Sequence, residues 1–293
     1  MVRKLVFAAA AFAALTAAAP AYSTEVVRIG TTAGPYAEIL RYAGDLAAKQ
    51  GIEVKITEFT DYTVPNAALA QDDLDINNFQ HQPYLDNQVA QRGYDIVSIA
   101  KSIIVPIGIY SNKVKTLADI KDGASAAIPN DPSNGARALQ LFEKAGLIKL
   151  KPGIGIKATI ADIAENPRHL KIVELDAAQL PRSLNDLDFS AVNLNYALSA
   201  GLDPKSALLL EGADTNWNLV FAVRAKNKDN ATLKKFVEIY RSPEVKAFTE
   251  KRFNGTFSPL GETGRRRNDH LFILPSIARP APRPVVRIQD HRT

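Results

Sequence analysis

Polar and aromatic side chains gather where predicted strands end and predicted helices begin. These positions are Asp61 and Tyr62, the run Phe79–Gln80–His81, the run Asn130–Arg137, Asn193 and Asn218. The ligand crevice of an open α/β sheet lies outside the carboxyl ends of its strands. If two sheets face each other across a cleft, these positions converge, and together they can bind a small polar molecule.

Arg137 carries the most informative charge of this set. It lies in the first turn of a predicted helix, where the positive end of the helix dipole disfavours a cation. An anionic partner is therefore expected. A ligand carboxylate and an internal Asp or Glu fit the pattern equally well.

The other candidates each have a structural explanation beside a functional one. Asn193 and Asn218 border apolar strands, where a buried amide is tolerated only with hydrogen-bond partners. Taken alone, His81 is better explained as a structural histidine. Tyr62 and Phe79 can be ordinary core aromatics. The combination is more specific than any single residue in it.

Motifs of common enzyme classes and metal sites are missing or incomplete. The chain has no cysteine, which excludes disulfides, thiolate zinc sites, iron–sulfur clusters and thiol nucleophiles. Residues 123–127 match the nucleophile-elbow pattern only in part, because the fifth residue is alanine, and Ser125 is expected in a strand. The four histidines are too dispersed for a metal cluster. We therefore expect no catalytic residue, no cofactor and no metal.

The body of the chain alternates between strand and helix patterns, which predicts an α/β fold with layers around largely parallel sheets. Strands are expected at 26–30, 52–59, 74–76, 94–110 (two runs broken by Pro106), 125–128, 171–175, 190–194 and 218–224. Helices are expected at 35–50, 64–69, 83–92, 117–121, 133–145, 179–187, 232–240 and 243–252.

Two of the β-rich segments, near 107–111 and 219–224, can connect two lobes. Lobe one then comprises residues 24–108 plus 224–258, and lobe two comprises residues 112–218. Each lobe has a common domain size. Two connecting strands form a hinge that can close over a ligand.

The charge and the N-terminus indicate an exported protein that binds no nucleic acid. The formal net charge is +5, but residues 22–258 carry 27 Lys and Arg against 28 Asp and Glu. A nearly neutral body argues against phosphate-backbone binding. Residues 1–21 match a signal peptide, with a basic start, an apolar run and the small residues Ala19–Pro20–Ala21. Cleavage is expected after Ala21, with Ser23 as the second choice.

Residues 259–293 form an atypical tail with seven Arg, no Lys and several prolines. So abrupt a change in composition indicates a frameshifted or fused end, and we expect this basic Pro/Arg tail to be disordered. A basic arm for anionic lipid or nucleic acid is the less favoured alternative.

Several long motifs carry a family resemblance. They are FTDYTVPN at 59–66, NFQHQPYLD at 78–86, IPNDPSNGAR at 128–137, ENP at 165–167, ELDAAQLPRS at 174–183, AVN at 191–193 and WNL at 217–219. With them the chain resembles the substrate-binding proteins of methionine ABC importers, the NlpA lipoprotein family, over about residues 25–257. The resemblance implies a two-lobed periplasmic-binding-protein fold (type II-like) with two hinge strands.

The resemblance also implies a pocket for a free amino acid. Arg137 would bind the ligand carboxylate by a two-pronged contact. Asn134, Asn193 and Asn218 would bind the carboxylate and the ammonium group through their amides. The slot for the thioether side chain would be lined by Tyr62, Phe79 and His81. We expect methionine as the ligand, with the L isomer bound and the D isomer left open.

Partners and location follow from the same resemblance. The protein would deliver its ligand to an inner-membrane ABC permease and its ATPase, as a periplasmic monomer. Family members usually carry a lipid-modified cysteine, and because this chain has none we expect an unlipidated form. Two alternatives stay open, a binding protein for another amino acid or small dipeptide, and an enzyme on the same scaffold with His81 as general base.

Overall fold

The computed structural model describes residues 24–212 and 217–259, which belong to one compact unit. The predicted signal peptide, residues 1–21, lies outside the described residues, as does the predicted tail from residue 260 onward. In the described part of the chain, no helix has the length and apolar character that a membrane crossing requires.

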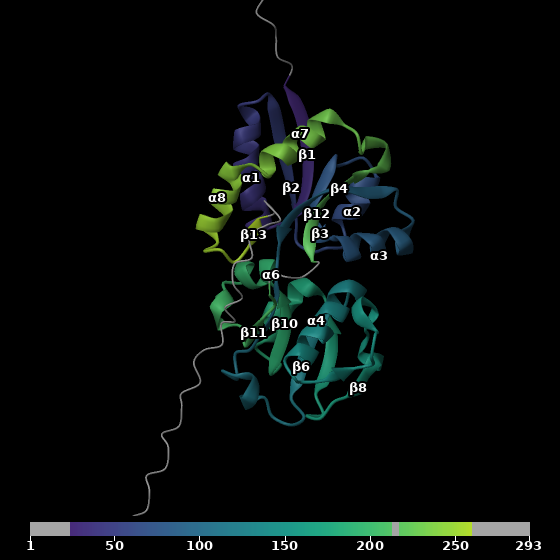
Figure 1. Ribbon diagram of the computed structural model, residues 1–293, viewed down its shortest axis with the longest axis vertical. Coiled ribbons are helices and arrows are strands. Elements are labelled where there is room, and N and C mark those ends of the chain that lie inside the picture. The colour runs from purple at the N-terminus through teal and green to yellow at the C-terminus, as the bar shows by residue number, and fades with distance from the viewer. Residues whose placement is uncertain (1–23, 213–216, 260–293) are drawn as a thin grey trace, which may run out of the picture. The chain divides into compact units, whose positions relative to one another are not determined.

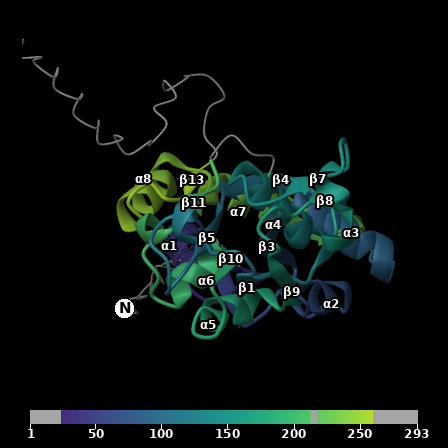
Figure 2. The same ribbon diagram turned by 90° about the horizontal axis from the view of Figure 1, so that it is seen from below.

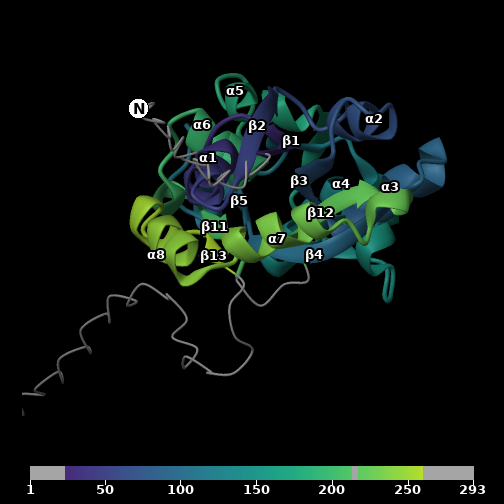
Figure 3. The same ribbon diagram turned by 90° about the horizontal axis from the view of Figure 1, so that it is seen from above.

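The first of two main sheets has six strands in the order β13-β4-β12-β3-β1-β2. Its strands are β1 (Glu25–Thr32), β2 (Ile52–Phe59), β3 (Ile76–His81), β4 (Ile96–Ile104), β12 (Asn218–Arg224) and β13 (Ser258–Pro259). The helices packed on it are α1 (Pro35–Ala48), α2 (Pro65–Ala70), α3 (Gln82–Arg92), α7 (Ala231–Tyr240) and α8 (Pro243–Arg252). Figures 1 and 3 show α1, α7 and α8 grouped together, while α2 and α3 lie beyond β3 and β12.

The second main sheet has five strands in the order β11-β5-β10-β6-β9. Its strands are β5 (Ile107–Tyr110), β6 (Ser125–Pro129), β9 (Lys171–Leu175), β10 (Phe189–Asn193) and β11 (Leu209–Leu210). It packs with α4 (Pro132–Lys144), α5 (Leu180–Ser183) and α6 (Leu194–Ser199), and a small pair, β7 (Lys149–Leu150) with β8 (Ile163–Glu165), completes this part. Figure 2 shows α4 on one side of β10 and α5 with α6 on the other.

Strand β10 is buried on both faces because helices cover both faces of its sheet. Successive side chains of a strand point to opposite faces. Phe189 and Ala191 belong to the core built with α4, whereas Val192 belongs to the other main core. That core also contains Leu194 of α6 and Ile39 of α1, so it extends from one sheet to the other. The carboxyl end of β10, where Asn193 stands, is held between the two cores.

The structure confirms the predicted alternation of strands and helices, with two differences. The strand expected at 74–76 is β3, Ile76–His81, so Phe79, Gln80 and His81 lie within the strand and not after it. The sheets are also less parallel than expected. Strand β12 runs antiparallel to both β3 and β4, and β5 runs antiparallel to β10. These antiparallel strands lie where the chain passes from one sheet to the other. Strands β4 and β5 flank the first passage, and β11 and β12 flank the second.

Two expected helices are also shorter. The segment 117–121 is a 3-10 turn at Leu117–Asp119, and the segment 179–187 divides into a 3-10 turn at Ala177–Gln179 and the short helix α5.

The chain passes between the sheets twice. It first crosses at Val105 and Pro106, between β4 and β5, and it returns between the end of β11 at Leu210 and the start of β12 at Asn218. The segments predicted as connectors, 107–111 and 219–224, coincide largely with β5 and β12 and lie beside these crossings. The exact residues at which the two lobes divide stay a prediction.

Candidate functional site

One cavity brings most of the predicted site residues together. The space between its walls is about 300 Å³, including the part that opens to solvent. It is lined by Tyr36, Tyr62, Phe79, Gln80, His81, Tyr84, Val105, Asn134, Arg137, Asn193 and Leu219. Six of the seven predicted ligand-binding residues line it, and the seventh, Asn218, directly precedes a lining residue.

The start of helix α4 places Asn134 and Arg137 at the cavity. Asp131 caps this helix by accepting from the backbone N–H of Asn134 at 2.9 Å, and it also accepts from the Asn134 side-chain amide at 2.9 Å. Burial raises the pKa of Asp131 above its usual range. Gly135 allows the first turn to lie against β6, because a Cβ atom there would be 2.9 Å from the carbonyl oxygen of Pro129.

His81 is neutral and both of its ring nitrogens are engaged. It caps helix α3, where Nδ1 accepts from the backbone N–H of Tyr84 at 3.1 Å. The ring proton therefore lies on Nε2, which donates to Oδ1 of Asn134 at 3.1 Å. Burial, with the nearby charge of Arg137, lowers the pKa of His81 to about 3. The bond between His81 and Asn134 links strand β3 of the six-stranded sheet to helix α4.

Arg137 forms a buried ion pair with Glu211, a residue that sequence analysis did not single out. Nε of Arg137 lies 3.1 and 3.0 Å from the two carboxylate oxygens, and Nη2 donates both to Glu211 and, at 2.6 Å, to the carbonyl of Val105. The Arg137 side chain is 3% exposed and that of Glu211 is 10% exposed. Of the two partners compatible with the sequence, the internal acid is the one present here. The sequence signal for such an acid was Arg137 itself, a cation in the first turn of a helix.

The ion pair leaves part of the guanidinium unused. Nη1 of Arg137 makes no hydrogen bond within the described residues, whereas Nε and Nη2 are engaged. The two-pronged contact that was expected for a ligand is made with Glu211 instead. A ligand carboxylate at this site would therefore bind to Nη1.

Two buried amide oxygens near the cavity lack hydrogen-bond partners. Asn193 donates from Nδ2 to Oδ1 of Asn134 at 3.0 Å, yet its own Oδ1 has no partner among the described residues, and neither has Oδ1 of Asn218. An unpartnered buried acceptor is costly. Both oxygens can accept hydrogen bonds from an ammonium group, while Nη1 of Arg137 can donate to a carboxylate.

Aromatic rings form the apolar wall of the cavity. The ring centroids of Tyr62 and Phe79 are 6.0 Å apart, and those of Phe79 and Tyr84 are also 6.0 Å apart. Tyr36 lines the cavity from the first turn of α1. Tyr36 and Tyr84 were not predicted as site residues, although each lies in the first helical turn after a strand.

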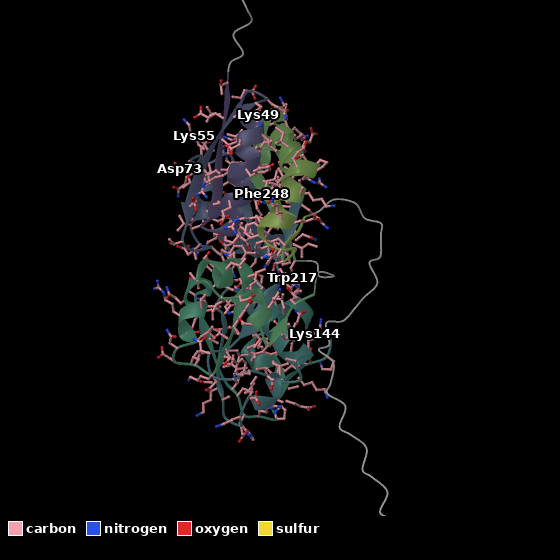
Figure 4. All side chains as sticks on the ribbon, turned by 90° about the vertical axis from the view of Figure 1, so that its left-hand side faces the viewer. Lys49, Lys55, Asp73, Lys144, Trp217 and Phe248 are labelled. Atoms are coloured by element: carbon pink, nitrogen blue, oxygen red, sulfur yellow. The ribbon has the colours of Figure 1, made fainter. Side chains whose placement is uncertain are left out.

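Trp217 covers the guanidinium of Arg137. Its ring centroid is 4.9 Å from Cζ of Arg137, within the range of a cation–π contact. It is also 4.8 Å from the ring centroid of His81. Figure 4 shows Trp217 at the level where the elements of the two sheets meet, with Phe248 of α8 among the elements of the six-stranded sheet. Trp217 belongs to the WNL motif at 217–219, and nothing in its sequence position distinguishes it from a core residue.

Comparison with known proteins gives consistent matches over this whole region. The model of the family described as NlpA lipoprotein matches residues 27–261. The D-methionine-binding lipoprotein MetQ of Salmonella typhimurium is 45% identical over 233 residues, which are 78% of this chain and 86% of that protein. MetQ of Escherichia coli K12 is 42% identical over the same shares.

Solved structures agree with these relatives. A nutrient-binding protein from Burkholderia cenocepacia bound to methionine is 52% identical, with a TM-score of 0.78, and the match covers 80% of this chain and 99% of that one. A periplasmic substrate-binding protein of an ABC transporter from Coxiella burnetii is 49% identical, with a TM-score of 0.77 and coverage of 80% and 100%. These matches confirm the predicted two-lobed α/β fold, and the chain belongs to the NlpA lipoprotein family.

Proposed function

We propose that this protein is a periplasmic solute-binding protein that captures methionine in the cavity between its lobes and delivers it to an ABC importer. One observation carries the proposal. Within the described residues, Nη1 of Arg137 has no hydrogen-bond partner, and neither has Oδ1 of Asn193, which also lines the cavity, or Oδ1 of Asn218, whose neighbour Leu219 lines it. A free amino acid supplies a carboxylate for the first and an ammonium group for the others. The methionine-binding relatives support the same conclusion.

The aromatic wall suits the side chain of methionine. Tyr62, Phe79 and Tyr84 all line one cavity, and their rings pack against one another. A thioether against an aromatic ring is favourable by about 0.3–1.5 kcal/mol per contact. His81, being neutral, adds no charge to this slot. The same wall disfavours a charged ligand side chain, because such a group would lose its hydration without gaining a counter-ion.

Binding, not catalysis, is the role that the site supports. A histidine that acts as a general base needs a ring nitrogen that can reach and accept the proton of the reacting group. Both ring nitrogens of His81 are already in hydrogen bonds, and its pKa of about 3 makes it a weak base. The relatives found are binding proteins. The enzyme alternative on this scaffold is therefore disfavoured.

The partners would be an inner-membrane ABC permease and its ATPase, with the binding protein acting as a monomer. Relatives named as periplasmic or as lipoproteins support export. The expectation of an unlipidated form rests only on the absence of cysteine from the sequence and stands against the lipoprotein names of the relatives.

Calorimetric titration of the purified protein tests the function. The panel is L-methionine, D-methionine, a methionyl dipeptide and leucine. We expect L-methionine to bind with micromolar or tighter affinity and leucine to bind much more weakly. Tighter binding of leucine or of the dipeptide would assign a different solute to the same cavity, and turnover of any of these compounds would point to an enzyme.

A further inference from the structure

Glu211 is anchored to the chain crossing that faces it. Its backbone N–H donates to the carbonyl of Ile107 at 2.9 Å, and its carboxylate accepts from the N–H of Ile107 at 3.3 Å. The guanidinium of Arg137 binds this carboxylate and the carbonyl of Val105, two residues before Ile107. Arg137 therefore binds to a residue at each crossing, Val105 at the first and Glu211 at the second. Glu211 is itself held by two hydrogen bonds to the backbone of Ile107.

We propose that Glu211 sets which net charge of ligand the cavity accepts, so that a zwitterion is preferred over a plain carboxylate anion. The inference rests on the proposed function. Arg137 is the charged side chain among the cavity-lining residues, and Glu211 cancels that charge from the side away from the cavity. A zwitterion enters a balanced site without adding net charge. An anion without an ammonium group adds an uncompensated negative charge beside a carboxylate.

The distances make this discrimination large. Glu211 lies within hydrogen-bond distance of Nε of Arg137, and Nη1 belongs to the same guanidinium, so a ligand carboxylate on Nη1 would lie only about 6–7 Å from Glu211. At the effective dielectric of partly buried sites, the repulsion between two like charges at that separation raises the dissociation constant more than tenfold. The ammonium group of a zwitterion offsets most of this repulsion. Asp131, behind Asn134, is the same in every variant below and does not affect the comparison.

The experiment compares two probes of equal length in the full chain. One is L-methionine, and the other is 4-(methylsulfanyl)butanoate, which lacks only the ammonium group. The readout is the ratio of their dissociation constants, measured by calorimetry or by competition. In Glu211→Gln, we expect the butanoate to gain at least tenfold relative to L-methionine. A loss of packing alone would weaken both probes alike and leave the ratio unchanged.

Two further variants control the measurement. Glu211→Asp keeps the charge but shortens the side chain. The ratio of the two dissociation constants in this variant should stay within threefold of that in the unmodified protein, which separates loss of charge from loss of packing. Glu165→Gln removes the same formal charge from an exposed pair with Lys149 and should leave the ratio unchanged. A tenfold shift in Glu211→Asp, or an unshifted ratio in folded Glu211→Gln, overturns the inference.

Failure of the inference differs from failure of the proposed function. If the unmodified protein binds L-methionine and the ratio does not respond to Glu211, only the inference is wrong. If the unmodified protein binds neither probe, the proposed function is wrong as well.

Discussion

The hydroxyl of Tyr62 donates a hydrogen bond of 2.7 Å to Oδ1 of Asn195. Tyr62 follows β2 of the six-stranded sheet, and Asn195 lies in α6, directly after β10 of the other sheet. A second bond of 3.3 Å joins the hydroxyl of Tyr196 to the carbonyl of Thr60 across the same boundary. These bonds link the lobes in the arrangement seen here, and they must break if the lobes separate.

Tyr62→Phe should weaken ligand binding without removing the aromatic wall. The ring stays, but Oδ1 of Asn195 loses its donor and the closed arrangement loses about 1 kcal/mol. We expect a roughly fivefold rise in the dissociation constant of L-methionine, mainly through faster release, measured by stopped-flow fluorescence. Tyr42→Phe is the matched control, because Tyr42 stacks on Phe248 away from the cavity. An unchanged release rate in Tyr62→Phe would show that the hydrogen bond between Tyr62 and Asn195 does not slow the separation of the lobes.

Asn218→Ala should weaken ligand binding but leave the stability of the ligand-free protein unchanged. The Asn218 amide makes no hydrogen bond within the described residues, and its Oδ1 is buried. Removing it breaks no internal bond, so the melting temperature of the ligand-free protein should not fall by more than about 2 °C. The rise in melting temperature caused by L-methionine should shrink markedly. A full ligand-induced rise would show that Asn218 does not contact the ligand.

His81 should make the protein less stable in mild acid. The pKa of His81 is about 3 in the folded protein and near 6.5 when histidine is free, so between these values the unfolded chain binds a proton that the folded chain does not. The free energy of unfolding should therefore fall as the pH drops below 6.5, by up to about 1.4 kcal/mol per pH unit from this group.

Urea titrations at several pH values can isolate this contribution. Glutamine has an acceptor and a donor that can replace those of His81, but it does not titrate. The difference in unfolding free energy between the original protein and His81→Gln should thus shrink steadily from pH 7 to pH 4.5. A difference that does not vary with pH would mean that folding does not lower the pKa of His81.

Gly135→Ala should damage the site by moving helix α4. The new Cβ atom would lie 2.9 Å from the backbone oxygen of Pro129, closer than such atoms approach, so the helix must shift. Overpacking of this kind costs about 1–3 kcal/mol. The shift also displaces Asn134 and Arg137, and L-methionine binding should weaken at least tenfold. Lys144→Ala, on the exposed end of the same helix, should change neither quantity.

The sequence predicts the elements that position the site because their signals are local. Apolar periodicity and glycine placement give the helix over 133–145 and the strand over 125–128 within a few residues of α4 and β6. The same signals place Asn193 and Asn218 at strand ends. Local signals thus place candidate residues at strand ends and helix starts, while the choice of the seven ligand-binding residues comes from the family resemblance; six of those seven line one cavity, and Asn218 directly precedes a lining residue.

The interactions that the sequence does not predict depend on distant pairing. Glu211 is 74 positions from Arg137, and only the antiparallel pairing of β11 with β5 brings it to the first crossing. Strands of two residues, such as β11 and β13, have no period to detect. The sequence requires an anion near Arg137, but only the fold specifies which one.

Replacing the buried ion pair and titrating with L-methionine tests the central claim most directly. The double variant Arg137→Gln with Glu211→Gln removes both charges together, so no buried charge is left without its partner. If Arg137 binds the ligand carboxylate, this variant should fold, as judged by circular dichroism, and bind L-methionine at least a hundredfold more weakly than the unmodified protein. A folded double variant that retains the original affinity would contradict the account.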